Sequence, residues 1–187
     1  MRSLVKGGIT AIILFTCFTA NSQQIISTPQ FRKEFLDNIN YTRQKGCTCG
    51  IKYMRPVLPL IWNDNLEVAA MEHATDMYNR NYFSHDSKDG RSMEDRIVFA
   101  GYLFKGYKSF SIGENIAMGQ QSIAEVMRGW FKSEGHCKNL MSPTFKEVGV
   151  AVNNAYWVQD FGGRESFSDE QQKLIKSGKY RLIEKTR

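Results

Sequence analysis

Apolar side chains recur at helical spacing in two long segments near the start of the chain. Thr28 followed by Pro29 is a cap with a first-turn proline, and the spacing that follows predicts a helix over 29–45. Asp64 followed by Glu67 matches a capping box and predicts the start of a second helix. The buried face of this second helix is predicted to hold Leu66, Ala69, Ala70, His73, Ala74 and Met77.

Capping signals predict two more helices further along the chain. Ser92 with Asp95 starts a short one. Ser122 with Glu125 starts another, and Gly135 is predicted to end it. The core-facing stripe of this last helix is predicted to comprise Ile123, Val126, Met127, Trp130 and Phe131.

Strand signals are concentrated in the second half of the sequence. The runs EVGVAV and AYWVQDF are predicted strands, separated by Asn153 and Asn154, a pair that tolerates positive φ and suits a tight hairpin. A further strand is predicted around GENIAMG. Helices and an antiparallel hairpin in one small chain predict an α+β domain, with helices packed against a small antiparallel sheet.

The N-terminus predicts export. Arg2 and Lys6 precede the apolar run ITAIILFTCFTA and then small and polar residues, the pattern of a signal peptide over 1–22. The run is about a dozen residues, shorter than the roughly 20 that span a bilayer, so no transmembrane segment is expected. We therefore expect a secreted protein, extracellular or periplasmic. A lipid anchor on Cys17 is the weaker alternative, because bulky residues precede it.

Composition fits one globular domain after the signal peptide. About 165 residues remain, with ordinary hydrophobic (42%) and charged (24%) content for the whole chain. We expect a domain over 23–163 and a basic tail over 164–187. Polyanions or nucleic acid would be partners for a basic tail, but a solvated terminal helix or frayed end is the favoured interpretation, and no nucleic-acid partner is expected.

Three cysteines follow the predicted signal peptide: Cys47, Cys49 and Cys137. An oxidising compartment favours a disulfide. Cys47 and Cys49 are too close in the chain to pair comfortably with each other, so one of them is predicted to pair with Cys137. A zinc site is the alternative, but four ligands at characteristic spacings are missing.

Two histidines and one glutamate are the candidate site residues. His73 falls on the apolar face of the second helix and is predicted to be a core residue. His85 and His136 fall in a polar turn and at a helix end, where sites are often built. Glu114 is a lone carboxylate among small and apolar residues. Two imidazoles and a carboxylate suit zinc or metal-free acid/base chemistry, although no compact zinc motif such as HExxH is present.

Three other chemistries fit the sequence less well. Ser133 with His136 and Glu114 would make a hydrolase triad, but no GxSxG motif accompanies it, and Ser133 fits a helix end. A Cys137–His136 pair would lose its thiol to a disulfide. The DFG tripeptide that starts at Asp160 lacks every other kinase motif and is interpreted as the end of a strand.

Five motifs occur in one order between Phe35 and Gly163: LIWNDNLEVAAMEHATDM, YFSH, GENIAMG, WFKSEGHCKNLMSPTFKEVGVAV and YWVQDFG. This arrangement resembles the CAP superfamily, also called the SCP or pathogenesis-related-1 family, and its bacterial branch in particular. The resemblance implies an α-β-α sandwich with a central cleft. It also implies that His85, Glu114 and His136 line this cleft, where many relatives bind a divalent metal, often zinc, with a second glutamate.

The sequence departs from the family pattern at that second glutamate. Ser133 occupies the expected position, and Glu134 is one residue further on, a rotation of about 100° on a helix. Glu134 is therefore a doubtful member of the site. The resemblance also implies a disulfide between Cys49 and Cys137, with Cys47 as the spare thiol.

Three functions remain open at this point. The favoured one is a secreted binding module whose cleft holds zinc, or another divalent cation such as calcium or magnesium, together with an extracellular ligand such as a lipid or a cell-surface component. The second is a metal-dependent hydrolase or protease with Glu114 as general base. The third is an interaction module without metal, in which the cleft residues form a polar network.

Overall fold

The computed structural model describes residues 27–181, so the predicted signal peptide and Cys17 lie outside the described residues. The helices of this part are α1 (Pro29–Lys45), α2 (Asp64–Arg80), α3 (Met93–Phe99), α4 (Ile123–Lys132), α5 (Glu134–Leu140) and α6 (Asp169–Lys176). The strands are β1 (Cys47–Cys49), β2 (Lys52–Met54), β3 (Ile61–Trp62), β4 (Ser109–Met118), β5 (Glu147–Asn153) and β6 (Tyr156–Glu165).

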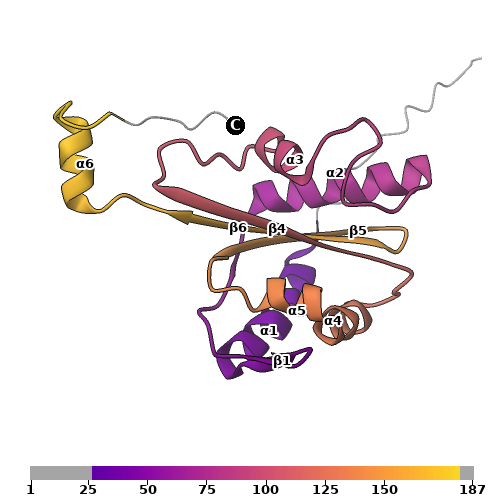
Figure 1. Ribbon diagram of the computed structural model, residues 1–187. Helices are drawn as coiled ribbons and strands as arrows, with labels where there is room; N and C mark the ends of the chain where they lie inside the picture. The colour runs from indigo at the N-terminus through magenta and orange to yellow at the C-terminus, as the bar shows by residue number, and fades with distance from the viewer. Residues whose placement is uncertain (1–26, 182–187) are drawn as a thin grey trace, which may run out of the picture.

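A four-stranded sheet separates two layers of helices (Figure 1). Its strand order is β3-β5-β6-β4, and β4 and β5 both run antiparallel to β6. Helices α2 and α3 cover one face, and α1, α4 and α5 cover the other, where β1 and β2 form a separate hairpin. The predicted α+β class and α-β-α sandwich are confirmed. The short β3 adds a parallel pairing with β5 that the sequence did not indicate.

Three predicted helix starts occur where the capping residues placed them. Helix α1 spans the predicted residues, and the Thr28 hydroxyl accepts a hydrogen bond from the amide of Phe31. Ser92 and Asp95 form the predicted reciprocal capping box of α3. Ser122 caps α4 by accepting from the amide of Glu125, which satisfies half of the predicted box.

Two details of helix limits were wrong. Helix α2 is capped by the Asn63 side chain and not by Asp64. Glu67 does not form the predicted capping box, since its carboxylate accepts a hydrogen bond from the indole nitrogen of Trp62 at 2.8 Å. Gly135 does not end α4. The extended backbone of Ser133 ends it, and Gly135 lies in the first turn of α5, where amides have no partner within the helix and a glycine is tolerated.

The β5–β6 hairpin is confirmed, with its turn one residue later than predicted. Asn153 pairs with Tyr156, so the two turn residues are Asn154 and Ala155. Both have positive φ, 46° and 64°, as a type I′ turn requires. The turn sets a register that aligns all of β5 along β6, which continues to Glu165, two residues beyond the predicted domain limit.

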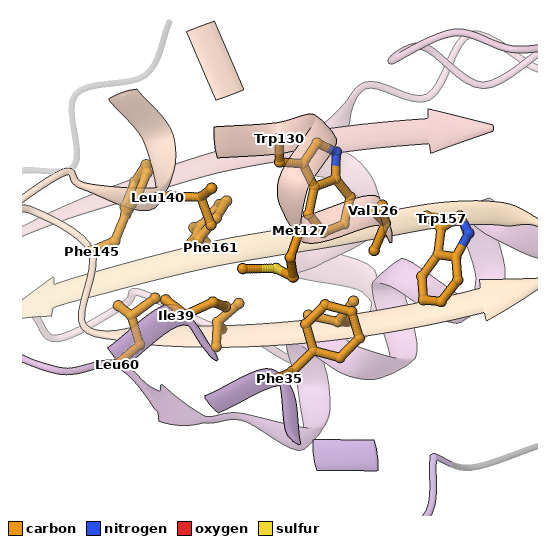
Figure 2. Close-up of a cluster of buried hydrophobic side chains, with 12 residues drawn as sticks. Phe35, Ile39, Leu60, Val126, Met127, Trp130, Leu140, Phe145, Trp157 and Phe161 are labelled. Carbon is orange, nitrogen blue, oxygen red and sulfur yellow. The ribbon is translucent and has the colours of Figure 1, made fainter. Parts of the chain in front are cut away.

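The larger hydrophobic core lies between the sheet and the α1, α4 and α5 layer (Figure 2). Trp130 of α4 and Phe35 of α1 meet there, and the rings of Phe145 and Phe161 stack 5.1 Å apart. The core stripe predicted for α4 is confirmed at its buried members, Val126, Met127 and Trp130. Burial of such large side chains contributes about 1.5–3 kcal/mol each.

Helix α2 lies unusually close to the opposite face of the sheet. Its contact residues are small, with Ala70 and Ala74 fully buried. At Gly149 of β5 an added Cβ atom would lie 2.0 Å from the backbone nitrogen of Glu67. Because the helix packs this closely, side chains of α2 reach the polar positions in the middle of the sheet.

The described part of the basic tail begins with the last two residues of β6 and then forms helix α6, which stands away from the sandwich (Figure 1). Helix α6 begins with a capping box at Ser168 and Gln171 and buries no residue. Within residues 27–181, no helix combines the length and the apolar character needed to cross a bilayer.

Candidate functional site

Glu114 of β4 is a buried carboxylate with both oxygens engaged. Its side chain is 1% exposed. One oxygen, Oε1, accepts a hydrogen bond from His85 Nδ1 at 2.7 Å, and Oε2 accepts one from Arg96 Nη2 at 2.7 Å. Arg96 projects from α3 and is itself 2% exposed. The charge of this carboxylate is therefore balanced by a buried guanidinium, as burial of an ion demands.

His85 lies in the loop after α2 and joins this buried pair to solvent. Its side chain is 58% exposed. The hydrogen bond with Glu114 raises the pKa of His85 above its usual value, although partial burial opposes the rise. Because Nδ1 is directed at Glu114, the second ring nitrogen, Nε2, is the one that remains for a ligand.

His136 approaches the same strand from the other helix layer. It lies on α5 and is half-buried, and its backbone carbonyl accepts a hydrogen bond from Asn115 Nδ2 at 3.3 Å. Burial, and then the charge of His85, lower the pKa of His136. Glu114 and Asn115 are successive residues of a strand and point to opposite faces. Strand β4, at the edge of the sheet, thus carries polar groups toward both layers.

Asn115 organises a second polar cluster on the α5 side. Its amide nitrogen donates to Gln159 Oε1 at 3.0 Å, and its amide oxygen accepts from Asn139 at 2.9 Å. Asn139 also donates to the backbone carbonyl of Glu114 at 3.2 Å. These bonds tie α5, which carries His136, to the middle of β4 and β6.

Asp160 of β6 lies directly across from Glu114 in the β4–β6 ladder and is fully buried. Neither of its oxygens makes a well-formed hydrogen bond within residues 27–181. Burial raises the pKa of Asp160 well above its usual value, and the neighbouring charge of Glu114 raises it further. Asp160 is therefore the group that holds a proton beside Glu114.

His73 is confirmed as a core residue. It is fully buried on α2, and its Nε2 donates to the backbone carbonyl of Ser84 at 2.9 Å. The same nitrogen is 3.9 Å from Glu114 Oε2, too far for a hydrogen bond. Burial lowers the pKa of His73, so its neutral form supports the loop that carries His85.

The doubtful candidate Glu134 is engaged elsewhere. Its carboxylate pairs with Lys138 one turn along α5 at 2.5 Å, and its side chain packs directly against Gly50. Ser133 is the N-cap residue of α5, which agrees with its interpretation as a helix-end residue. No hydrogen bond or ion pair in the described part of the chain joins the Glu134 side chain to Glu114 or to either candidate histidine.

The disulfide implied by the family resemblance is present. Cys49 and Cys137 are bridged across a Cα–Cα distance of 5.4 Å, and Cys47 is free. Within residues 27–181, one group of three or more His, Cys, Asp or Glu side chains places its ligand atoms within 4.8 Å of one another, and it consists of these three cysteines. Within the same residues, the ligand atoms of His85, Glu114 and His136 do not form such a group.

Sequence reasoning missed Arg96 and the role of Asp160. Arg96 was overlooked because a charged residue in a short capped helix is usually solvated. Asp160 was seen only as part of the DFG tripeptide. A usable signal was present, since Asp160, together with Gln159, lies between apolar residues in a strand segment that predicts burial on both faces.

Comparison with known protein families identifies the class of protein to which this fold and this polar site belong. The chain belongs to the CAP family: the family model described as the cysteine-rich secretory protein family matches residues 36–161.

Individual relatives come from several bacteria. The chain is 34% identical to the YkwD protein of Bacillus subtilis (strain 168) over 140 residues, which are 74% of this chain and 49% of that protein. An extracellular protein of Bacillus anthracis str. Ames that contains an SCP domain superimposes with a TM-score of 0.59 and 29% identity, over 73% of this chain and 44% of that one.

A second solved structure shares the fold alone. An outer surface protein of Borrelia burgdorferi superimposes with a TM-score of 0.58 and 21% identity, over 75% of this chain and 97% of that one. The chain spans about half the length of YkwD and a third of the length of a second Bacillus subtilis relative, the membrane protein YlbC.

Proposed function

We propose that this protein is an exported CAP-domain binding module in which His85 and His136 hold a divalent cation that helps to fix an extracellular ligand. The observation that carries the proposal is the Glu114–His85 hydrogen bond, which leaves the second imidazole nitrogen of His85 for a ligand, and the charge of His85 is near enough to the half-buried His136 to lower its pKa. The extracellular and surface locations named for two structural relatives support export.

The donor set fits zinc better than calcium or magnesium. Calcium and magnesium prefer oxygen ligands, whereas imidazole nitrogen suits zinc. Both Glu114 oxygens are already hydrogen-bonded, so its fitting role is that of the carboxylate that orients a ligating histidine and increases its basicity. When bound, zinc would supply a Lewis-acid centre whose remaining positions accept an oxygen or nitrogen of the ligand.

The contacts of Glu114 argue against the hydrolase alternative. A general base needs a carboxylate oxygen within reach of a water. In this site one oxygen is bonded to His85 and the other to Arg96, and the side chain is 1% exposed. The interaction module without metal remains the competing candidate, because the same hydrogen bonds also suffice to order the loop that carries His85.

Metal content separates the two candidates. We expect mass spectrometry of tag-free protein, equilibrated with zinc near neutral pH, to find about one zinc per chain, and none in the His85→Ala, His136→Ala double variant. The Glu114→Gln variant should bind zinc about 10–100-fold more weakly, because it loses the orienting carboxylate. The Glu134→Gln variant is the matched control and should retain zinc.

Two results would contradict the proposal. Wild-type protein without zinc, or a double variant that binds zinc as tightly as wild type, would leave the interaction module as the function. Circular dichroism of each variant checks that loss of metal is not loss of fold.

A further inference from the structure

The three cysteines within residues 27–181 form a compact sulfur cluster outside the polar site. Cys47 and Cys49 are two residues apart on β1, so their side chains share one face of the strand. Cys137 of α5 lies against that face. Cys47 Sγ is 3.7 Å from Cys137 Sγ and 3.9 Å from Cys49 Sγ, close to van der Waals contact for sulfur. The free thiol therefore touches both atoms of the disulfide.

Access to the cluster is uneven. Cys49 and Cys137 are fully buried, whereas Cys47 is partly exposed. The cluster is lined by apolar side chains, namely Met54, Val57, Phe131 and Met141. A thiol in solution cannot reach the disulfide sulfurs directly, but it can reach Cys47.

We propose that Cys47 is the nucleophile of a thiol–disulfide exchange site, which moves the disulfide from Cys49–Cys137 to Cys47–Cys137. The Cys47 thiolate attacks Cys137 Sγ and forms the new S–S bond. The Cys49–Cys137 bond breaks, and its electron pair leaves on Cys49, which takes up the proton that Cys47 released. One disulfide and one thiol exist before and after, so no oxidant or reductant is consumed.

The strain of the product bridge favours attack on Cys137 over attack on Cys49, since Cys47 Sγ lies beside the S–S bond, almost equidistant from its two sulfurs, and the Cys47 side chain must rotate into line with the bond to react at either. A Cys47–Cys49 bridge would join two residues of one strand whose Cα atoms are about 6.6 Å apart, near the upper limit for a disulfide. The alternative bridge, like the present one, joins β1 to α5, and its two sulfurs are the closer pair at 3.7 Å.

The exchange gives the buried disulfide a route to external thiols. Once Cys47 carries the bridge, a small thiolate can attack its exposed sulfur, which leaves a mixed disulfide on Cys47 and a thiolate on Cys137. The reverse attack by Cys137 restores the bridge and releases the small thiol. The substrate class is therefore a thiol-bearing small molecule or peptide, independent of any metal at the histidines.

The first test uses the Cys49→Ser variant of the full chain. We expect non-reducing peptide mass spectrometry after air oxidation to find a Cys47–Cys137 bridge in most molecules. Alkylatable thiols on both Cys47 and Cys137 in folded, monomeric Cys49→Ser protein would overturn the proposal. Burial raises the pKa of the Cys47 thiol, so the incubation is made at about pH 8.5, where more thiolate forms.

The second test does not depend on that variant folding. Wild type and Cys47→Ser, which keeps the present bridge, are incubated with reduced glutathione, and bridge opening and glutathione adducts are followed by mass spectrometry. We expect the wild-type bridge to open at least about 10-fold faster, with the adduct on Cys47. Equal rates, or an adduct first on Cys49 or Cys137, would overturn the proposal.

Discussion

Replacement of Arg96 by methionine would test the charge balance at the centre of the site. Methionine keeps much of the apolar volume of the side chain but removes the guanidinium that donates to Glu114 and, at 3.2 Å, to the Ser87 hydroxyl. Glu114 would keep its hydrogen bond with His85. The variant therefore leaves a buried carboxylate with one partner in place of two.

The size of the effect follows from burial. Removal of one partner of a buried ion pair costs about 3–5 kcal/mol, because the remaining charge is uncompensated. His85 can supply part of the missing charge when it is protonated, so we expect about 3 kcal/mol near neutral pH. The pKa of His85 is raised in the folded protein, so the loss should be smaller at acidic pH and should grow as the pH rises through that pKa.

Urea denaturation with the disulfide intact measures this loss. Arg91→Met is the matched control, because it removes an exposed pair with Asp89 at 2.9 Å whose side chains are 39% and 38% exposed, and such pairs contribute about 0–1 kcal/mol. Addition of Glu114→Gln to Arg96→Met should recover part of the stability. An Arg96→Met protein no less stable than Arg91→Met would refute the reasoning.

Two further predictions concern the face of the sheet under α2. Gly149→Ala should destabilise the fold by about 3 kcal/mol in thermal melts, because the new Cβ would lie 2.0 Å from the backbone of α2. Gly129→Ala is the control, since Gly129 of α4 has open space around it, and this variant should be neutral or slightly stabilising in the same measurement. Asp160 has a raised pKa in the folded state, so its contribution to wild-type stability should fall as pH rises above about 4, where the unfolded chain releases this proton. Asp160→Asn should lack this pH-dependent contribution, so its free energy of unfolding, measured by urea titration, should increase relative to that of wild type from about pH 4 to pH 7. A difference in unfolding free energy that does not change with pH would exclude a buried, protonated Asp160.

Local signals in the sequence predicted the starts of α1, α3 and α4 because the physical causes of a helix cap are local, whereas the β1–β2 hairpin and α5 were not predicted. Thr28 and Pro29 start α1 through bonds within one turn, and the same holds for Ser92 and Asp95 at α3. The turn of the hairpin lies one residue later than predicted, because more than one pair of adjacent residues around Asn154 can occupy the two turn positions. The packing of β5 on β6 decides which pair does so.

The candidate site was predictable only in part because its partners are far apart in the chain. Glu114 was singled out as a carboxylate in an apolar setting, and burial confirms the setting. Arg96 meets it from a helix 18 residues earlier, and Asp160 meets it across the ladder. Neither contact leaves a local pattern, because both depend on how α3 and β6 dock against β4.

The alternation of polar groups along β4 has a consequence for how the length of this protein can change during evolution. Glu114 faces the α2 and α3 layer and pairs with Asp160, while Asn115 faces α5 and pairs with Gln159. A single insertion or deletion inside Ser109–Met118 would turn the residues beyond it to the opposite face of the sheet. The carboxylate of Glu114 would then lie among the amide side chains on the α5 side, and the amide of Asn115 would lie against the guanidinium of Arg96. We therefore expect insertions and deletions in the segments that flank the strand and not inside it.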